Sequence, residues 1–268
     1  MTEPPTGPER ATSDVHIDGD ASSRSPSQRE QSVADIAAAV RVCTLCGLSG
    51  TRTNAVPGEG SPSPSIMFIG EGPGSNEDQQ GRPFVGRAGK LLDELLGVVP
   101  LLCSDVYITN VVKCRPPENR DPTPDEVRAC WPYLESQIRT LRPRVIATLG
   151  RHAMNRFLPE ARISDAHGRI TRWRDIVIFP LYHPAAALRS TSLRQTLEAD
   201  MRRIPEAVLR SLSLDSRDSV GSADSHDSGH AVPASPGTSP GANTSADPGP
   251  ALHGESPGEE GPAQRPLF

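Results

Sequence analysis

The sequence predicts a three-layer α/β protein, in which a mostly parallel sheet lies between two layers of helices. Short apolar runs alternate along the chain with helical patterns, which is typical of a parallel sheet with crossover connections. Glycine, asparagine and histidine motifs follow the predicted strands directly. Ligands of such sheets bind beyond the carboxyl ends of the strands, so these motifs mark the expected site.

The first half of the core contains two predicted helices and two predicted strands. Residues 32–42 are expected to form a helix, because Ser32 stands three residues before an aspartate in a capping-box pattern. IMFIG at 66–70 predicts a buried strand, and RAGKLLDELLGVV at 87–99 predicts an amphipathic helix. VYITNVV at 106–112 predicts the second strand.

The second half repeats this alternation. A capped helix is predicted at 123–141, and Pro132 inside it is expected to introduce a kink. RVIATLG at 144–150 predicts a third strand, whose final glycine opens a short helix. Residues 170–182 fit a tight hairpin or a bent strand, and residues 192–208 fit a last helix.

Both ends of the chain have a different composition from the core. Residues 1–32 and 213–268 are rich in Ser, Pro, Gly and Asp and nearly free of aliphatic side chains. Such segments bury too little apolar surface to offset their ordering entropy, so both are predicted to be disordered tails. The sequence therefore predicts one folded domain at 33–212, which is long enough for one well-filled core.

Charge separates along the same boundaries. The formal net charge is −5, with +4 on residues 33–212 and −9 on the two tails. A mildly basic domain permits a nucleic-acid partner without indicating one strongly. The chain shows no signal-peptide pattern and no apolar stretch long enough to span a bilayer, so a cytoplasmic location and no membrane contact are expected.

Four cysteines form an uneven set. Cys43 and Cys46 make a C-x-x-C pair, whereas Cys114 and Cys130 stand alone. In a reducing compartment such a set indicates metal or redox chemistry more often than disulfides. The spacing favours a [4Fe–4S] cluster over zinc, which usually takes two close pairs, and leaves zinc or no metal as alternatives. The fifth, Cys103, lies in an apolar run and is interpreted as a small buried hydrophobe.

The first strand-end motif is GEGPG at 70–74. Three glycines and a proline predict a tight turn whose backbone can approach a ligand closely. Glu77 follows, and Phe84 lies between two glycines. The phosphate-loop patterns are absent, and the acidic residues would repel phosphate. The alternative is a structural turn with a core phenylalanine.

The other two motifs follow later strands. The Asn110 side-chain amide offers a donor and an acceptor that match the edge of a nucleobase, although a turn asparagine is the simpler interpretation. His183 precedes Pro184 and a loop of small residues that ends in Leu188 and Arg189. Taken alone, His183 fits a structural histidine better than a catalytic one.

Together these motifs resemble a known family. GEGPGSNEDQQGRPFVGRAGKLL, YITNVVKCRPPENRDPTP and LYHPAAAL, in this order and with the four cysteines, closely resemble the iron–sulfur (family 4) uracil-DNA glycosylases. The resemblance covers residues 33–210 and implies the uracil-DNA-glycosylase α/β fold, excision of uracil from DNA, and a nucleoid-associated monomer. It also implies a [4Fe–4S] cluster, with the ligands Cys43, Cys46, Cys114 and Cys130.

The resemblance implies a role for each motif. Phe84 would stack on a uracil flipped out of the DNA, and Asn110 would bind its N3–H and O4 and so reject cytosine. His183 would stabilise the leaving anion at O2. The turn that begins at Gly70 would help through its backbone amides. Leu188, with Arg189 beside it, would fill the vacated stack and contact phosphate.

The group that activates water is less clearly indicated. Cluster-free uracil glycosylases have an aspartate where this chain has Gly72, which can abstract no proton. Glu71 and Glu77 are the nearby candidate catalytic carboxylates, and Glu77 is alternatively a guard against thymine at C5. Lys90 and Lys113 are poorly placed for the sugar, so a monofunctional enzyme is predicted rather than a lyase.

The chain ends in QRPLF, which resembles the short peptides that bind the bacterial sliding clamp. Leu267 and Phe268 would fill an apolar pocket while Gln264 fixes the register. Two other functions compete with uracil excision. One is a DNA- or clamp-binding adaptor without activity, and the other is a glycosylase for a different deaminated base, such as hypoxanthine or xanthine.

Overall fold

A six-stranded sheet forms the centre of the protein. The computed structural model describes residues 25–99 and 106–220, with the side chains of 214–220 excepted. The strand order is β1-β3-β2-β4-β6-β5. The four inner strands are parallel, and the edge strands β1 and β5 pair antiparallel, which confirms the mostly parallel sheet. The strands are β1 (Glu59–Gly60), β2 (Ile66–Gly70), β3 (Val106–Asn110), β4 (Val145–Leu149), β5 (Thr171–Trp173) and β6 (Ile176–Leu181).

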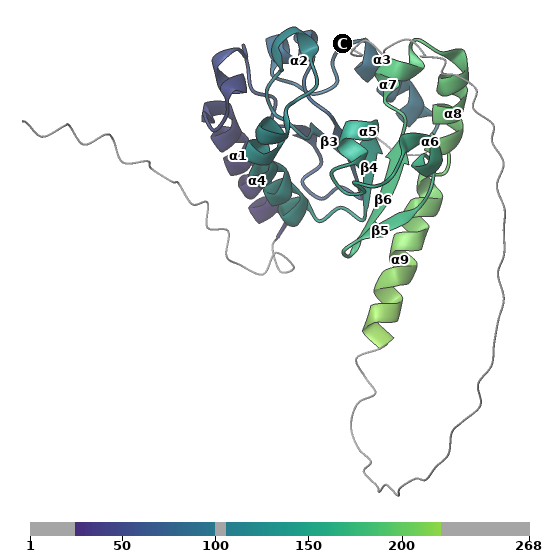
Figure 1. Ribbon diagram of the computed structural model, residues 1–268. Coiled ribbons are helices and arrows are strands. Elements are labelled where there is room, and N and C mark those ends of the chain that lie inside the picture. The colour runs from purple at the N-terminus through teal and green to yellow at the C-terminus, as the bar shows by residue number, and fades with distance from the viewer. Residues whose placement is uncertain (1–24, 100–105, 221–268) are drawn as a thin grey trace, which may run out of the picture.

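Helices cover both faces of this sheet, as the strand patterns predict. Ile66 and Phe68 of β2 pack into one apolar core, whereas Met67 and Ile69 pack into a second core on the opposite face. Figure 1 shows α1 and α4 on one side of the sheet and α8 and α9 on the other. The first core includes α3 (Arg87–Gly97), α8 (Thr191–Met201) and α9 (Ile204–Val220); the second includes α1 (Pro26–Val42), α4 (Pro124–Leu141) and α5 (Arg151–Met154).

Two predicted helix bounds are wrong. The first helix begins at Pro26 rather than at residue 32, because Ser25 and Gln28 form the capping box, while Ser32 donates to the carbonyl of Gln28 within the helix. The last helix is two helices rather than one at 192–208. α8 ends at Met201 and α9 begins at Ile204, since Pro205 lacks the N–H that a continuous helix requires.

The other elements lie close to their predicted bounds. The hairpin at 170–182 is β5 with β6, and Gly150 precedes the short helix α5, as expected. α4 extends from Pro124 to Leu141 with Pro132 inside it and is capped by Thr123. No helix in the described part of the chain is long and apolar enough to cross a membrane. Of the predicted disordered tails at 1–32 and 213–268, residues 26–32 are helical in α1 and residues 213–220 are helical in α9, so disorder is contradicted there. The rest of both tails, 1–24 and 221–268, and the prediction for Cys103 lie outside the described residues.

Several short elements were not predicted. They are α2 (Ser75–Gln80), α6 (Ile163–Ala166), α7 (Pro184–Ala187) and two 3₁₀ turns at Gly47–Gly50 and Pro117–Asn119. Three of them follow parallel strands within a few residues: α2 after β2, the 3₁₀ turn at 117–119 after β3, and α7 after β6. Figure 1 shows α2, α3 and α7 around the upper end of the molecule.

The packing of α3 predicts how two of its glycines respond to substitution. A Cβ on Gly89 would overlap the carbonyl group of Phe84, whereas a Cβ on Gly97 would meet nothing within 4 Å. Gly89→Ala should therefore lose about 1–3 kcal/mol or more through overpacking. Gly97→Ala should gain up to about 1 kcal/mol from helix propensity. Thermal unfolding of both variants beside the parent tests this, and equal melting temperatures for the two variants would contradict it.

Candidate active site

A cavity of about 300 Å³ lies at the carboxyl ends of the parallel strands. The pairing of β2 with β3 places Gly70 opposite Asn110, so the first two motifs lie side by side. His183 follows β6 and begins α7 at the same edge. The cavity walls include most of the predicted site residues: Gly72, Glu77, Phe84, Asn110, His183, Leu188 and Arg189.

Asn110 carries an acceptor without a partner. Its side chain is buried, with 1% of the residue exposed. Its Oδ1 atom accepts no hydrogen bond from the residues that the structure describes. A buried carbonyl oxygen without a donor costs free energy, so this atom indicates a ligand that brings an N–H group into the cavity.

His183 is held as a neutral imidazole. Its Nδ1 atom accepts a hydrogen bond from the backbone N–H of Ala185 at 3.1 Å, which places the ring proton on Nε2. Burial, with a smaller contribution from the charge of His152, lowers the pKa of His183 to about 4. At neutral pH this residue is therefore a neutral Nε2–H donor.

Phe84 lies beside His183 at the cavity wall. The two rings stack with centroids 6.0 Å apart and an interplanar angle of 27°. Phe84 has a φ of 52°, which is unfavourable for an aromatic residue and is held by the surrounding loop. A Cβ on Gly70 would collide with Oδ1 of Asn110 and lie 2.7 Å from the Phe84 ring, so glycine is required there.

Glu77 lines the cavity with both carboxylate oxygens already in use. Oε2 accepts from the N–H of Gly74 at 3.1 Å, and Oε1 accepts from the N–H of Gly86 at 2.8 Å. The carboxylate therefore ties the first motif to the loop that precedes α3. Its negative charge remains at the cavity wall.

Glu71 does not line the cavity; its side chain faces His152 and Asp121. Glu71 Oε2 lies 3.8 Å from His152 Nε2, and Asp121 Oδ2 lies 3.1 Å from the same nitrogen. Burial, with repulsion from Asp121, raises the pKa of Glu71 to about 7, although Arg151 opposes the shift. The two carboxylates that the sequence groups together thus occupy different sites.

The four predicted cysteine ligands line one small pocket. They come from the segment after α1, the segment after β3, and α4. All four are free thiols. Three of the sulfurs accept hydrogen bonds: Cys114 from Arg52 Nη1 at 3.0 Å, Cys130 from the N–H of Lys113 at 3.3 Å, and Cys43 from the N–H of Leu45 at 3.5 Å.

Comparison with known proteins identifies the family. Residues 57–204 match the model of the uracil DNA glycosylase superfamily. The chain is 49% identical over 177 residues to the type-4 uracil-DNA glycosylase of Sulfurisphaera tokodaii, which is 62% of this chain and 80% of that protein. The chain belongs to the type-4 uracil-DNA glycosylases.

Two more relatives define the position within the superfamily. The type-4 uracil-DNA glycosylase of Thermotoga maritima is 44% identical over 180 residues, covering 65% of this chain and 94% of that protein. The type-5 enzyme of Thermus thermophilus is 39% identical over 118 residues, covering 38% of this chain and 53% of that protein. The type-4 likeness therefore extends over far more of the fold.

The structure adds site residues of this type-4 chain that sequence reasoning missed. Asn76, Arg87 and Asn119 line the cavity, and Arg52 donates to a cysteine sulfur. Asn119 has a φ of 55°, and a left-handed asparagine is a recognised turn signal. No local pattern marks Arg52, because it reaches Cys114 across 62 positions of sequence. The predicted peptide Gln264, Leu267 and Phe268 lies outside the described residues.

The raised pKa of Glu71 predicts a pH-dependent stability. A carboxyl group whose folded pKa lies near 7 stabilises the fold fully below its unfolded pKa of 4.5, and that contribution is lost as the pH rises through 7. Relative to the parent, Glu71→Gln should therefore gain stability between pH 4.5 and 8, by about 3 kcal/mol at most. Thermal melts across this range measure the difference. Glu94→Gln, on the exposed face of α3, serves as the control. A parallel pH profile for the parent and Glu71→Gln would contradict the prediction.

Proposed function

We propose that this chain removes uracil from DNA by hydrolysing its N-glycosidic bond, and that it leaves an abasic site. The unpaired, buried Oδ1 of Asn110 is the observation that carries the proposal, together with membership of the type-4 family. The cavity is large enough to receive one nucleobase, which must be flipped out of the stack to reach it.

The Asn110 amide supplies the selectivity. Uracil presents a donor at N3–H and an acceptor at O4, which complement Oδ1 and Nδ2 of Asn110. Cytosine presents an acceptor at N3 and a donor at N4, so both contacts would oppose like groups in a buried site. Each mispaired group costs about 1–3 kcal/mol, which is sufficient to exclude cytosine.

His183 and the first motif stabilise the leaving group. When the bond between C1′ and N1 breaks, its electron pair moves onto the uracil ring, and O2 gains negative charge. The Nε2–H of neutral His183 donates to this oxygen, and the backbone amides of the Gly70–Gly74 turn assist. Phe84 stacks on the ring and holds it in the plane of these donors.

Glu77 is proposed to act through its charge rather than as a base. It is the one carboxylate among the described cavity-lining residues, and backbone N–H groups occupy both of its oxygens. A cationic, oxocarbenium-like sugar is stabilised by a nearby negative charge and needs little activation of water. Glu71, which does not line the cavity, would act only indirectly through His152.

The lysines support a monofunctional reaction. A lyase needs an amine that reaches C1′ of the sugar. The Nζ atom of Lys113 lies in the core, where it donates to Thr109 Oγ1 at 2.6 Å, Gln137 Oε1 at 2.7 Å and the Asn110 carbonyl at 2.8 Å. Lys90 lies on the exposed side of α3 and does not line the cavity.

We further propose that the four cysteines hold a [4Fe–4S] cluster. The four cysteines line one pocket although they are far apart in sequence. A pair plus two single cysteines suits a cluster better than the two close pairs that are usual for zinc. The N–H donors to the sulfurs are the usual partners of cluster thiolates, and Arg52 offsets part of their negative charge. Bound there, the cluster would join α1, α4 and the segment after β3.

The C-terminal peptide is proposed as a docking sequence for the sliding clamp. Gln264, Leu267 and Phe268 have the composition that an apolar pocket and a register-fixing amide require. Clamp binding by the full chain, and its loss in a chain that ends at residue 263, are the observations that this proposal needs.

The excision reaction is tested on an oligonucleotide that carries one uracil, with alkali cleavage of the abasic site as the readout. His183→Ala should lose about 10²–10³ of the rate, because one donor to the leaving anion is removed. Asn110→Asp should lose about 10–100-fold, because a second acceptor then faces O4. Asn155→Asp, an exposed residue after α5, is the matched control and should remain fully active.

Three results would contradict the proposal. Excision of hypoxanthine but not uracil would change the substrate. No excision of any base by cluster-loaded protein would favour the adaptor. A covalent protein–DNA adduct trapped by borohydride would contradict the monofunctional reaction.

Metal analysis of cysteine variants tests the cluster. The parent should contain about four iron atoms and a brown chromophore, and Cys43→Ser or Cys130→Ser should lose both and melt at a lower temperature. Cys103→Ser, at the one cysteine outside the set, should keep the iron and the colour. Zinc without iron in freshly purified parent would refute the assignment.

A further inference from the structure

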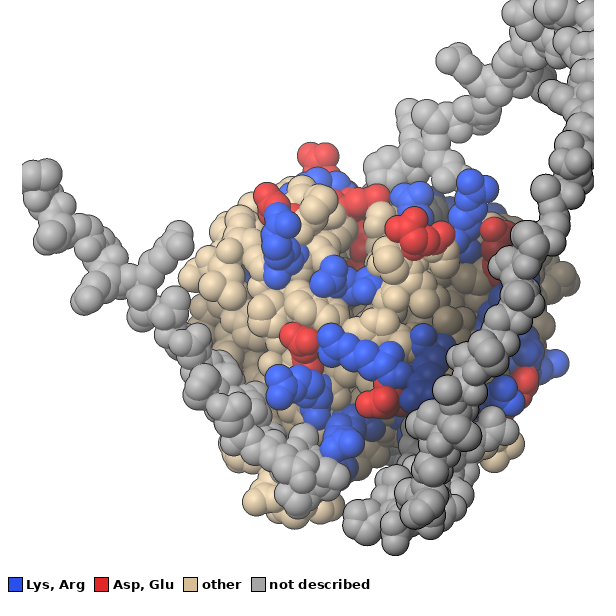
Figure 2. Space-filling view, turned by 60° about the horizontal axis from the view of Figure 1, so that its bottom comes forward, with Lys and Arg blue, Asp and Glu red and all other residues tan. Residues whose placement is uncertain are grey.

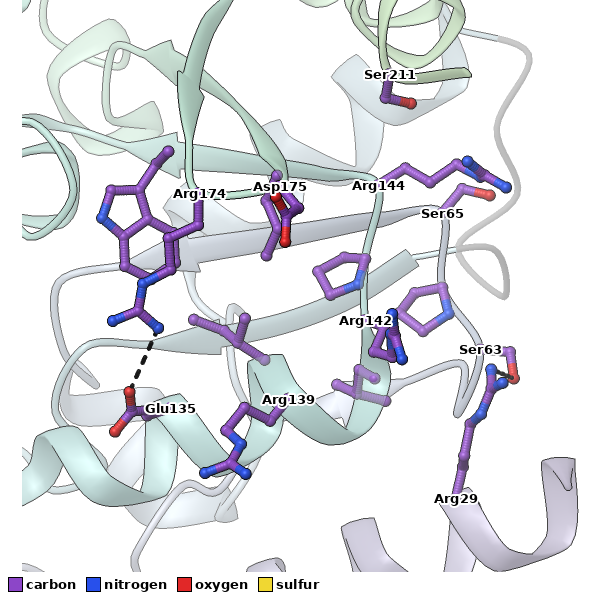
Figure 3. Close-up of a pocket in the computed structure, with 16 residues that line it drawn as sticks. Arg29, Ser63, Ser65, Glu135, Arg139, Arg142, Arg144, Arg174, Asp175 and Ser211 are labelled. Atoms are coloured by element: carbon purple, nitrogen blue, oxygen red, sulfur yellow. Dashed lines mark hydrogen bonds and ion pairs between the residues drawn. The ribbon is translucent and has the colours of Figure 1, made fainter. Parts of the chain in front are cut away.

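A second and larger hollow lies at the opposite edge of the sheet from the candidate active site. Its volume is about 600 Å³, and it is open to solvent. Five arginines line it and define what we call the arginine hollow: Arg29, Arg139, Arg142, Arg144 and Arg174. Figure 3 shows their side chains around one space, with α4 below and the strand ends behind.

The arginine hollow is formed by the amino ends of the parallel strands. Ser65 directly precedes β2, Arg144 precedes β4, and Arg174 lies in the turn that leads into β6. The candidate active site lies at the carboxyl ends of the same strands. A five-residue strand spans about 16 Å, so the sheet itself separates the two sites.

Among the described residues, the positive charge of the hollow is only partly neutralised, and Arg144 is itself engaged in an interaction. The two acidic residues of the hollow are engaged locally: Glu135 lies 3.8 Å from Arg174, and Asp175 lies 3.5 Å from Arg172. Arg139 and Arg142 are exposed and form no ion pair or hydrogen bond through their side chains with any described residue. Figure 2 shows basic side chains spread over this end of the molecule.

Two local features indicate that the hollow binds an anionic ligand. Arg142 ends α4 with a φ of 48°, a conformation that usually selects glycine or asparagine, and the cost of placing an arginine there is about 1 kcal/mol. Nε of Arg29 is buried without an acceptor among the described residues, while its Nη1 donates to Ser63 at 3.3 Å. A bound anion would supply acceptors to groups that the fold leaves without them.

We propose that the arginine hollow binds the phosphate backbone of a second DNA segment, distinct from the one that presents uracil. Planar guanidinium groups from α1, α4 and the β5–β6 turn match phosphate oxygens better than lysines would. A straight duplex that lies across the carboxyl ends of the strands does not reach their amino ends. The inference rests on the proposed DNA substrate and adds a contact that holds the enzyme on undamaged DNA between excisions.

DNA fits the hollow better than the chain's own acidic end does. Residues 221–268 contain six Asp or Glu against one Arg, and only two of the acidic residues are adjacent. DNA carries one charge for about every 1.7 Å of duplex, which suits several arginines within one hollow. The charge density of DNA therefore makes it the preferred occupant.

The test compares the full-length, cluster-loaded parent with Arg139→Gln/Arg142→Gln. Affinity for a long uracil-free duplex is measured between 50 and 200 mM salt. Loss of two phosphate contacts should reduce the slope of log affinity against log salt concentration by about 1.8. The ratio of the parent's affinity to the variant's affinity should therefore change about tenfold between 50 and 200 mM salt. Single-turnover excision from a short single-stranded uracil oligonucleotide should stay within twofold of the parent.

The matched control is Arg162→Gln/Arg202→Gln, which removes the same charge from residues that line neither the hollow nor the active-site cavity. Equal slopes for the two double variants would overturn the proposal, as would slowed excision of the short oligonucleotide. A labelled peptide of residues 221–268 that binds the parent but not the hollow variant, with unchanged DNA slopes, would assign the hollow to the tail instead. A parent that excises no uracil would refute the proposed excision. The affinities for uracil-free DNA would still decide whether the hollow binds DNA.

Discussion

The parallel pairing of β2 with β3 is the constraint on which the candidate site depends. It places Gly70 opposite Asn110, at the last pair of the register. The pair is close because Gly70 has no side chain, and any Cβ there would collide with the Asn110 amide. A slip of one residue would turn Asn110 to the other face of the sheet and remove the acceptor from the cavity. The proposed contact of Asn110 with the base therefore depends on backbone register more than on the loop around it.

A buried charge behind Asn110 reinforces this register. The ammonium of Lys113 has three donors, and Thr109, Asn110 and Gln137 provide three acceptors within 2.8 Å. Gln137 in turn donates to the carbonyl of Pro57 at 2.7 Å. Burial lowers the pKa of Lys113 to about 7, so the protonated form is tolerated there only because all three of its donors are satisfied. This network holds the segment after β3 in one conformation. The same segment continues into Cys114, so the cysteine pocket and the Asn110 amide share one short piece of backbone.

Sequence reasoning located what local patterns encode. Continuous apolar runs gave β2 and β4 their predicted positions, and the strand-end motifs named the residues that line the cavity, since parallel strands bring their carboxyl ends together. It could not separate Glu71 from Glu77, because the direction of each side chain is decided by distant partners: His152 for one and Gly86 for the other. It also missed the arginine hollow, whose residues come from positions 29 to 174 and share no local pattern.

The environment of His183 bears on how the proposed excision can proceed without a free carboxylate to activate water. With glycine at position 72 and both oxygens of Glu77 accepting backbone hydrogen bonds, the proposed mechanism draws its rate mainly from stabilising the departing uracil. A histidinium would be a stronger donor, but a folded pKa of about 4 makes it costly at neutral pH. The neutral ring avoids that cost, and the bond from Ala185 has already set its tautomer. In the proposed reaction the donor is therefore preorganised before the anion forms, which is the condition under which a single hydrogen bond contributes most to the transition state.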